Sequence, residues 1–94
     1  MDIVEILRST DSAPQILATL SVYAENLRNV AAIPDWCSTP LNSEADIQKR
    51  MAALFVAINL TSQHGLDHDC DNAKRALHVF AVALQRLNPR ISAD

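Results

Sequence analysis

Apolar residues recur every three or four positions along most of this chain, the spacing that places side chains on one face of an α-helix. Residues 2–10, 12–33, 43–64 and 69–88 each show this pattern. The clearest case lies in the third segment, where the apolar face is formed by Ile47, Met51, Leu54, Phe55 and Ile58. No segment alternates apolar and polar residues over a useful length, so the sequence predicts an all-α protein.

Capping residues indicate where the predicted helices begin and end. Asp2, Ser12 and either Asn42 or Ser43 are placed to cap the N-termini of the first three helices. Gly65 supplies the left-handed residue that commonly follows the end of a helix. The expected fold is a small helical bundle with one short N-terminal helix and three long helices. Neighbouring helices are expected to run antiparallel because the connections are short.

Length and composition are those of one ordinary globular domain, which we assign to residues 1–94. The net charge is −3, whereas surfaces that bind nucleic acid are normally basic, so nucleic acid is not the favoured partner. The chain begins without a basic or apolar leader, and its longest apolar run, residues 51–58, is too short to span a membrane. We therefore expect a cytoplasmic protein without a membrane partner, in which both cysteines are free thiols.

Residues 64–71, HGLDHDCD, hold the densest group of potential metal ligands in the chain. His64, His68 and Cys70 carry the nitrogen and sulfur atoms that bind zinc, but a structural site needs four converging ligands. The remaining candidate, Cys37, is separated from Cys70 by a predicted helix about 30 Å long. A glycine also interrupts the helix between the two histidines. We therefore predict no metal site and no cofactor, and name His64, His68 and Cys70 only as weak candidate ligands.

The favoured interpretation of the same stretch is a helix end, a turn and a helix start. His64 lies where the helix dipole favours a histidine, and Gly65 supplies the turn. The three aspartates precede or open the next helix, where negative charge is stabilising, and Cys70 falls on its apolar face. Only His68 is left without a structural role.

Other chemistry has less support in the sequence. An EF-hand loop beginning at Asp67 would lack both its central glycine and its terminal glutamate. A nucleophilic pair of Cys70 with His64 or His68 is accompanied by no recognisable oxyanion hole, and the single glycine of the chain excludes phosphate-cradling loops. We therefore predict a protein that is not an enzyme.

A DNA-binding regulator is a further alternative. The short turn between the last two helices resembles a helix-turn-helix, with Lys74 and Arg75 near the start of the reading helix. The three aspartates at the same end would repel phosphate groups. This alternative therefore ranks below protein binding.

The third and fourth helices carry more apolar residues than a three-helix core requires. The extra surface is either covered by the N-terminal helix or used by a partner, and the only tryptophan is either a plug for one end of the bundle or an interface anchor. We assign the partner-binding surface to Val56, Leu60, Val79, Val82, Trp36, Asp67, His68 and Asp69. The sequence thus predicts a non-enzymatic adaptor, regulator or inhibitor, with homodimerisation as one form of the interaction. A small metal-binding protein and a DNA-binding regulator remain the alternatives.

Overall fold

The computed structural model of the chain describes residues 2–27 and 41–88. Its regular elements are four helices: α1 (Ile3–Ser9), α2 (Ala13–Glu25), α3 (Glu44–Gln63) and α4 (Asp67–Leu87). The described residues include no strand, and the all-α prediction is confirmed. Within the same ranges, no helix combines the length and apolar character needed to cross a membrane.

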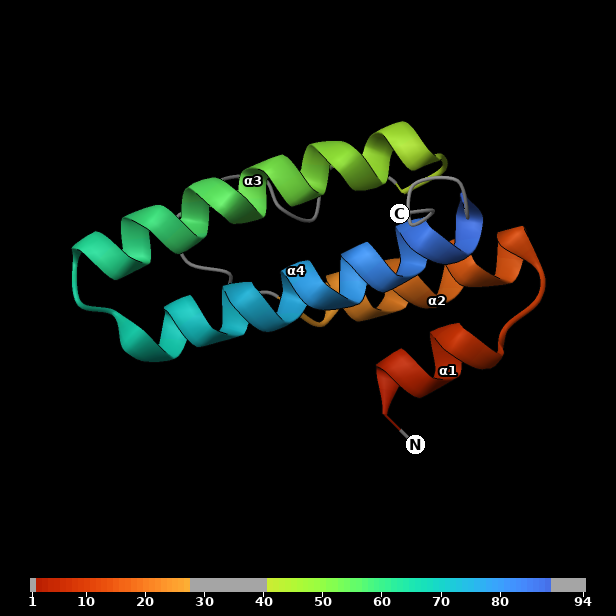
Figure 1. Cartoon of the computed structure of the whole chain (residues 1–94), viewed down its shortest axis with the longest axis horizontal. Coiled ribbons are helices and arrows are strands. Elements are labelled where there is room, and N and C mark those ends of the chain that lie inside the picture. Colours follow the sequence, from red (N-terminus) through yellow and green to blue (C-terminus); the bar gives the residue numbers. More distant parts are fainter. Residues whose placement is uncertain (1, 28–40, 89–94) are drawn as a thin grey trace.

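Helix α4 is the centre of the bundle and contacts each of the other three helices (Figure 1). Helix α3 packs along one side of α4. Among the described residues, helices α1 and α2 contact each other and also contact α4, but neither contacts α3. Figure 1 shows α4 running opposite to both α2 and α3, so α2 and α3 point the same way. The expected alternation of neighbours therefore does not hold between these two, because the segment joining them is long enough to permit a parallel arrangement.

Helix α2 is shorter than its apolar pattern predicted. We expected a helix to about residue 33, but α2 has 13 residues and ends at Glu25. Asn26 is its C-cap, and the backbone N–H of Leu27 bonds to the carbonyl of Ala24 at 3.1 Å, in the tighter geometry common at helix ends. Residues 28–40, and with them Trp36 and Cys37, lie outside the described residues.

Each helix contributes a fully buried side chain to one core, namely Leu7, Leu20, Leu54 and Phe80, all 0% exposed. Helix α4 buries residues on more than one side because it is flanked by α3 and by the pair of α1 and α2. Its buried residues are Cys70, Ala73, Ala76, Val79, Phe80, Val82, Ala83 and Leu84. The wide apolar surface of this helix is thus explained by packing within the chain.

One of the predicted N-caps forms its side-chain bond. The hydroxyl of Ser43 accepts the backbone N–H of Asp46 at 3.4 Å, while Asp2 and Ser12 occupy N-cap positions without such a bond. The carboxylate of Asp46 accepts the backbone N–H of Asn42 at 2.9 Å and the Ser43 hydroxyl at 3.3 Å. These bonds favour the ionised form and lower the pKa of Asp46.

Candidate functional site

The HGLDHDCD stretch ends one helix and starts the next, as predicted. Gly65 has a φ of +68°, the left-handed conformation, directly after the C-cap His64. The backbone N–H of Leu66 bonds to the carbonyl of Thr61 at 2.8 Å, and that of Gly65 bonds to Ser62 at 3.2 Å. These two bonds form a Schellman motif, which satisfies carbonyl groups left open at the end of α3.

The start of α4 differs from the prediction. We expected the helix to begin near Asp69, but it begins at Asp67, and its N-cap is Leu66. The turn leads directly into the helix, because the backbone N–H of Cys70 bonds to the carbonyl of Leu66 at 2.9 Å. No aspartate of the stretch therefore acts as N-cap. Asp67 and Asp69 instead lie in the first turn, where their charge interacts favourably with the helix dipole.

The structure does not bring His64, His68 and Cys70 together as a ligand set. His68 is exposed and its Nε2 lies 3.3 Å from Nδ2 of Asn72, one turn further along α4. Cys70 is 6% exposed, and its Sγ lies 3.8 Å from the carbonyl oxygen of Ile58 in α3. Two positions apart on a helix, His68 and Cys70 point in different directions. Among residues 2–27 and 41–88, no group of three His, Cys, Asp or Glu side chains is arranged to hold a metal ion.

Helix α4 is poorly placed to read DNA. Lys74, Arg75 and His78 are exposed, as the DNA-binding alternative requires. The same helix packs against α1, α2 and α3, whereas a recognition helix needs an open face that enters the major groove. Asp71 is also exposed and lies four residues before Arg75, on the same face. This arrangement does not favour the DNA-binding alternative.

Two residues of the predicted partner surface belong to the core instead. Val79 is 1% exposed and Val82 is 5% exposed. Their burial reflects the central position of α4, which is flanked by helices on more than one side. The prediction that Val79 and Val82 belong to the partner-binding surface is therefore wrong. Asp67 and His68 are exposed and Asp69 is half-buried.

The other half of the predicted surface is exposed on α3. Val56 is 55% exposed and Leu60 is 36% exposed. Phe55, which the apolar pattern placed in the core, is also 55% exposed. Among the described helices α3 contacts only α4, so its opposite side has no helix against it (Figure 1). The exposed residues Ala52, Phe55, Val56, Asn59 and Leu60 form what we call the α3 patch.

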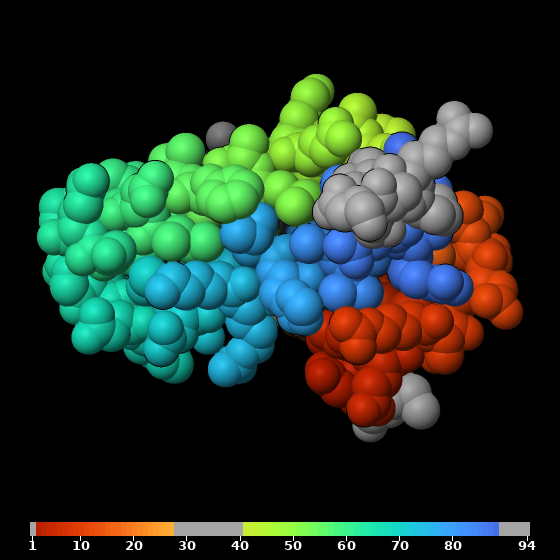
Figure 2. All heavy atoms as spheres, in the orientation of Figure 1, coloured from red at the N-terminus to blue at the C-terminus, as the bar shows by residue number. Residues whose placement is uncertain are grey.

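A groove lined by residues of α1, α2 and α4 opens elsewhere on the molecule, and Figure 2 shows its hollow between α1 and α4. It has a volume of about 580 Å³, and its lining includes Arg8, Tyr23, Arg75 and His78. From the sequence, Arg75 was a candidate only for DNA binding and Arg8 had no predicted role, because no local pattern indicates that three helices would bring these residues to one groove. The structure thus offers an apolar helix face and a groove with cationic side chains.

The sequence matches no known protein-family model, no curated protein and no solved structure. The function is therefore inferred from the two surfaces alone. The α3 patch is the larger departure from an ordinary protein surface, since it exposes an aromatic and two aliphatic side chains together.

Proposed function

We propose that this chain is a small non-enzymatic protein that binds another protein through the α3 patch, as an adaptor, regulator or inhibitor. The observation that carries the proposal is the exposure of Phe55 and Val56, 55% each, on a helix that lacks charged residues from position 51 to position 63. An apolar surface of this kind gains free energy when a partner removes it from water.

The geometry of the patch suits a helical partner. Its members follow the spacing i, i+3, i+4, i+7 and i+8, which forms one continuous stripe along α3. Amphipathic helices dock against apolar surfaces with this spacing, and an aromatic side chain such as Phe55 supplies the large contact area typical of an interface anchor. Exposed Gln48 and Gln63 lie beyond the two ends of the stripe and give it a polar border.

The uncharged character of the patch specifies the chemistry of the partner. A partner side chain with a charge would lose hydration against Phe55 and Val56 without gaining an opposite charge. We therefore propose that the partner presents an apolar helix face. A second copy of this chain could supply one through its own α3 patch, and this homodimer is one outcome of the test.

The proposal is tested by substituting one exposed valine on each of two helices. Val56→Glu places a charge in the α3 patch, and Val22→Glu makes the same change at a position of α2 that is 59% exposed. Tagged wild-type protein and both variants are used for affinity capture from the native cell, and light scattering measures the mass of each purified protein. Thermal unfolding of each variant establishes that it is folded.

We expect a protein, or a second copy of the chain, that is retained by the wild type and by Val22→Glu but not by Val56→Glu. Because both valines are more than half exposed, neither variant should lose its fold. Equal retention by both variants would overturn the proposal, and so would the absence of any associated chain in both experiments.

A further inference from the structure

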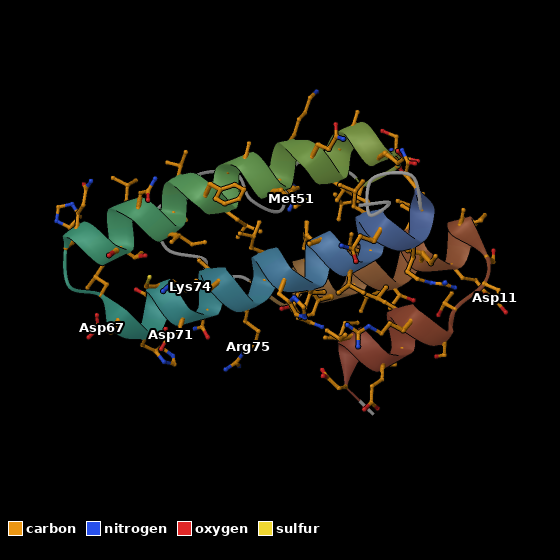
Figure 3. All side chains as sticks on the ribbon, in the orientation of Figure 1. Asp11, Met51, Asp67, Asp71, Lys74 and Arg75 are labelled. Carbon is orange, nitrogen blue, oxygen red and sulfur yellow. The ribbon has the colours of Figure 1, made fainter. Side chains whose placement is uncertain are left out.

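The groove between α1, α2 and α4 has an apolar part and a cationic part. Ile3 and Val4 of α1 and Val79 of α4 line the apolar part. Arg8 of α1 and Arg75 of α4 line the cationic part. Figure 2 shows the hollow between α1 and α4, and Figure 3 shows Arg75 projecting from the side of α4 that faces away from α3. The groove is therefore separate from the α3 patch.

Arg8 and Arg75 form no ion pair with a carboxylate of the described residues. In residues 2–27 and 41–88 the ion pair that forms joins Arg86 to Asp11, at 3.4 Å. Asp2 also lines the groove, so the described part of its lining holds two guanidinium groups and one carboxylate. This local excess of positive charge occurs in a chain whose net charge is −3. Asp71 lies one turn before Arg75 on the same face of α4 but outside this lining, so the excess of positive charge is that of the lining itself.

Tyr23 adds a hydrogen-bond donor from α2. Its side chain is half-buried in the groove lining, and burial raises its pKa because it disfavours the phenolate. The positive charge of Arg75 acts on Tyr23 in the opposite direction, and the negative charge of Asp2 raises the pKa further. The hydroxyl is therefore protonated at neutral pH and can donate to an oxyanion. His78, one turn after Arg75, adds an imidazole to the same lining.

We propose that this groove binds a small phosphate monoester whose phosphate is attached to an apolar or aromatic group. Arg8 and Arg75 contact the phosphate oxygens, and Tyr23 donates one further hydrogen bond. The apolar group lies against the partly exposed side chains of Ile3 and Val4.

The charge of the cationic part favours phosphate over carboxylate. A phosphate monoester carries a charge of about −1.5 to −2 at neutral pH and presents three terminal oxygens, so it can engage two guanidinium groups together. A carboxylate carries one charge and is matched by a single bidentate guanidinium. The side chain of arginine is also the cation best suited in shape to planar recognition of either group.

The test is a titration of the full chain with phenyl phosphate, followed by the backbone amide NMR signals of α1 and α4. Inorganic phosphate and phenol are titrated in parallel, which separates recognition of the phosphate from recognition of the ring. Benzoate tests the preference for phosphate over carboxylate. The variants are Arg75→Gln and Tyr23→Phe, with Lys74→Gln as a matched control, since Lys74 is exposed beside Arg75 and does not line the groove.

We expect saturable shifts with phenyl phosphate, weaker binding of inorganic phosphate and benzoate, and no binding of phenol. Arg75→Gln should weaken the binding of phenyl phosphate by about tenfold or more, because it removes a charge-assisted hydrogen bond. Lys74→Gln should change the same affinity by less than about twofold. Tyr23→Phe should weaken it by a smaller factor. The proposal is overturned if phenyl phosphate shows no saturation, if both charge variants have equal effects, or if benzoate binds as tightly as phenyl phosphate.

Discussion

Two identical substitutions distinguish the core of the bundle from the α3 patch. Val79 in α4 is 1% exposed and Val56 in α3 is 55% exposed, and both lie well inside their helices. Changing each valine to alanine deletes the same atoms from the same backbone geometry. The difference between the two variants therefore measures burial alone.

The expected magnitudes follow from that burial. Val79→Ala removes two buried carbon groups worth about 0.8 kcal/mol each and leaves a cavity that costs about 1 kcal/mol more, while the better helix propensity of alanine returns about 0.6 kcal/mol. The net loss in the free energy of unfolding is about 2 kcal/mol. Val56 is about half exposed, so Val56→Ala loses only about half of the same transfer free energy. The better helix propensity of alanine offsets most of this loss, and the net change in the free energy of unfolding is within about 0.5 kcal/mol.

The measurement is urea or thermal unfolding of both variants beside the wild type. For a domain of this size 1 kcal/mol corresponds to about 4–8 °C, so Val79→Ala should lower Tm by about 8–16 °C and Val56→Ala by less than about 4 °C. The unfolding is repeated at two protein concentrations, because a stabilising contact between two chains makes Tm depend on concentration.

Equal losses in the two variants would refute the placement of these valines. If Val56→Ala costs about 2 kcal/mol at every concentration, Val56 packs inside the chain and does not belong to a docking surface. A loss at Val56 that grows with concentration would instead identify the α3 patch as a contact between copies of this chain.

Further substitutions test the turn, the start of α3 and the link between α4 and α1. Gly65→Ala should lower the free energy of unfolding, measured by thermal unfolding, by about 1 kcal/mol. A Cβ at this position meets nothing within 4 Å, so the loss comes from the left-handed backbone alone, and a variant as stable as the wild type would refute this. The hydrogen bonds that lower the pKa of Asp46 below 3.8 stabilise the fold above that pH, and the gain is lost as pH falls through the lowered pKa. Asp46→Asn should therefore flatten the stability profile below about pH 4. Arg86→Ala should cost more than Asp11→Ala, because Arg86 also donates to the carbonyl of Thr10 at 2.8 Å, while the ion pair is exposed and worth less than about 1 kcal/mol.

Much of the secondary structure could be predicted because it depends on near neighbours in the chain. Apolar spacing indicated four helices, and the single glycine marked the turn between α3 and α4. The Schellman bonds around Gly65 join residues no more than five positions apart, so the local sequence contains the information needed to place them. Helix ends were less accurate, as the end of α2 at Glu25 and the start of α4 at Asp67 show. The N-cap of α4 is Leu66, a residue type that is not favoured at this position, so capping preferences alone misplace the start of this helix.

The exposure of individual apolar residues was decided only by the tertiary structure. Leu54 and Phe55 are adjacent and equally apolar, yet Leu54 is 0% exposed and Phe55 is 55% exposed, because α3 packs against α4 along one side only. Val79 and Val82 were expected on an exposed surface but are buried, because helices flank α4 on more than one side. Periodicity shows that a helix has an apolar face, but the neighbours determine how much of that face is covered.

The candidate surfaces depend on the tertiary structure to different degrees. Val56 and Leu60 could be selected from sequence because both lie on one helix, and their spacing already places them together. The groove combines Arg8, Tyr23 and Arg75 from three helices, and no local pattern relates them. By itself, therefore, the sequence determined the helices, the turn and part of the α3 patch. The position of α4 between the other helices decided which apolar residues are buried and which side chains line the groove, because both depend on contacts between residues far apart in the chain.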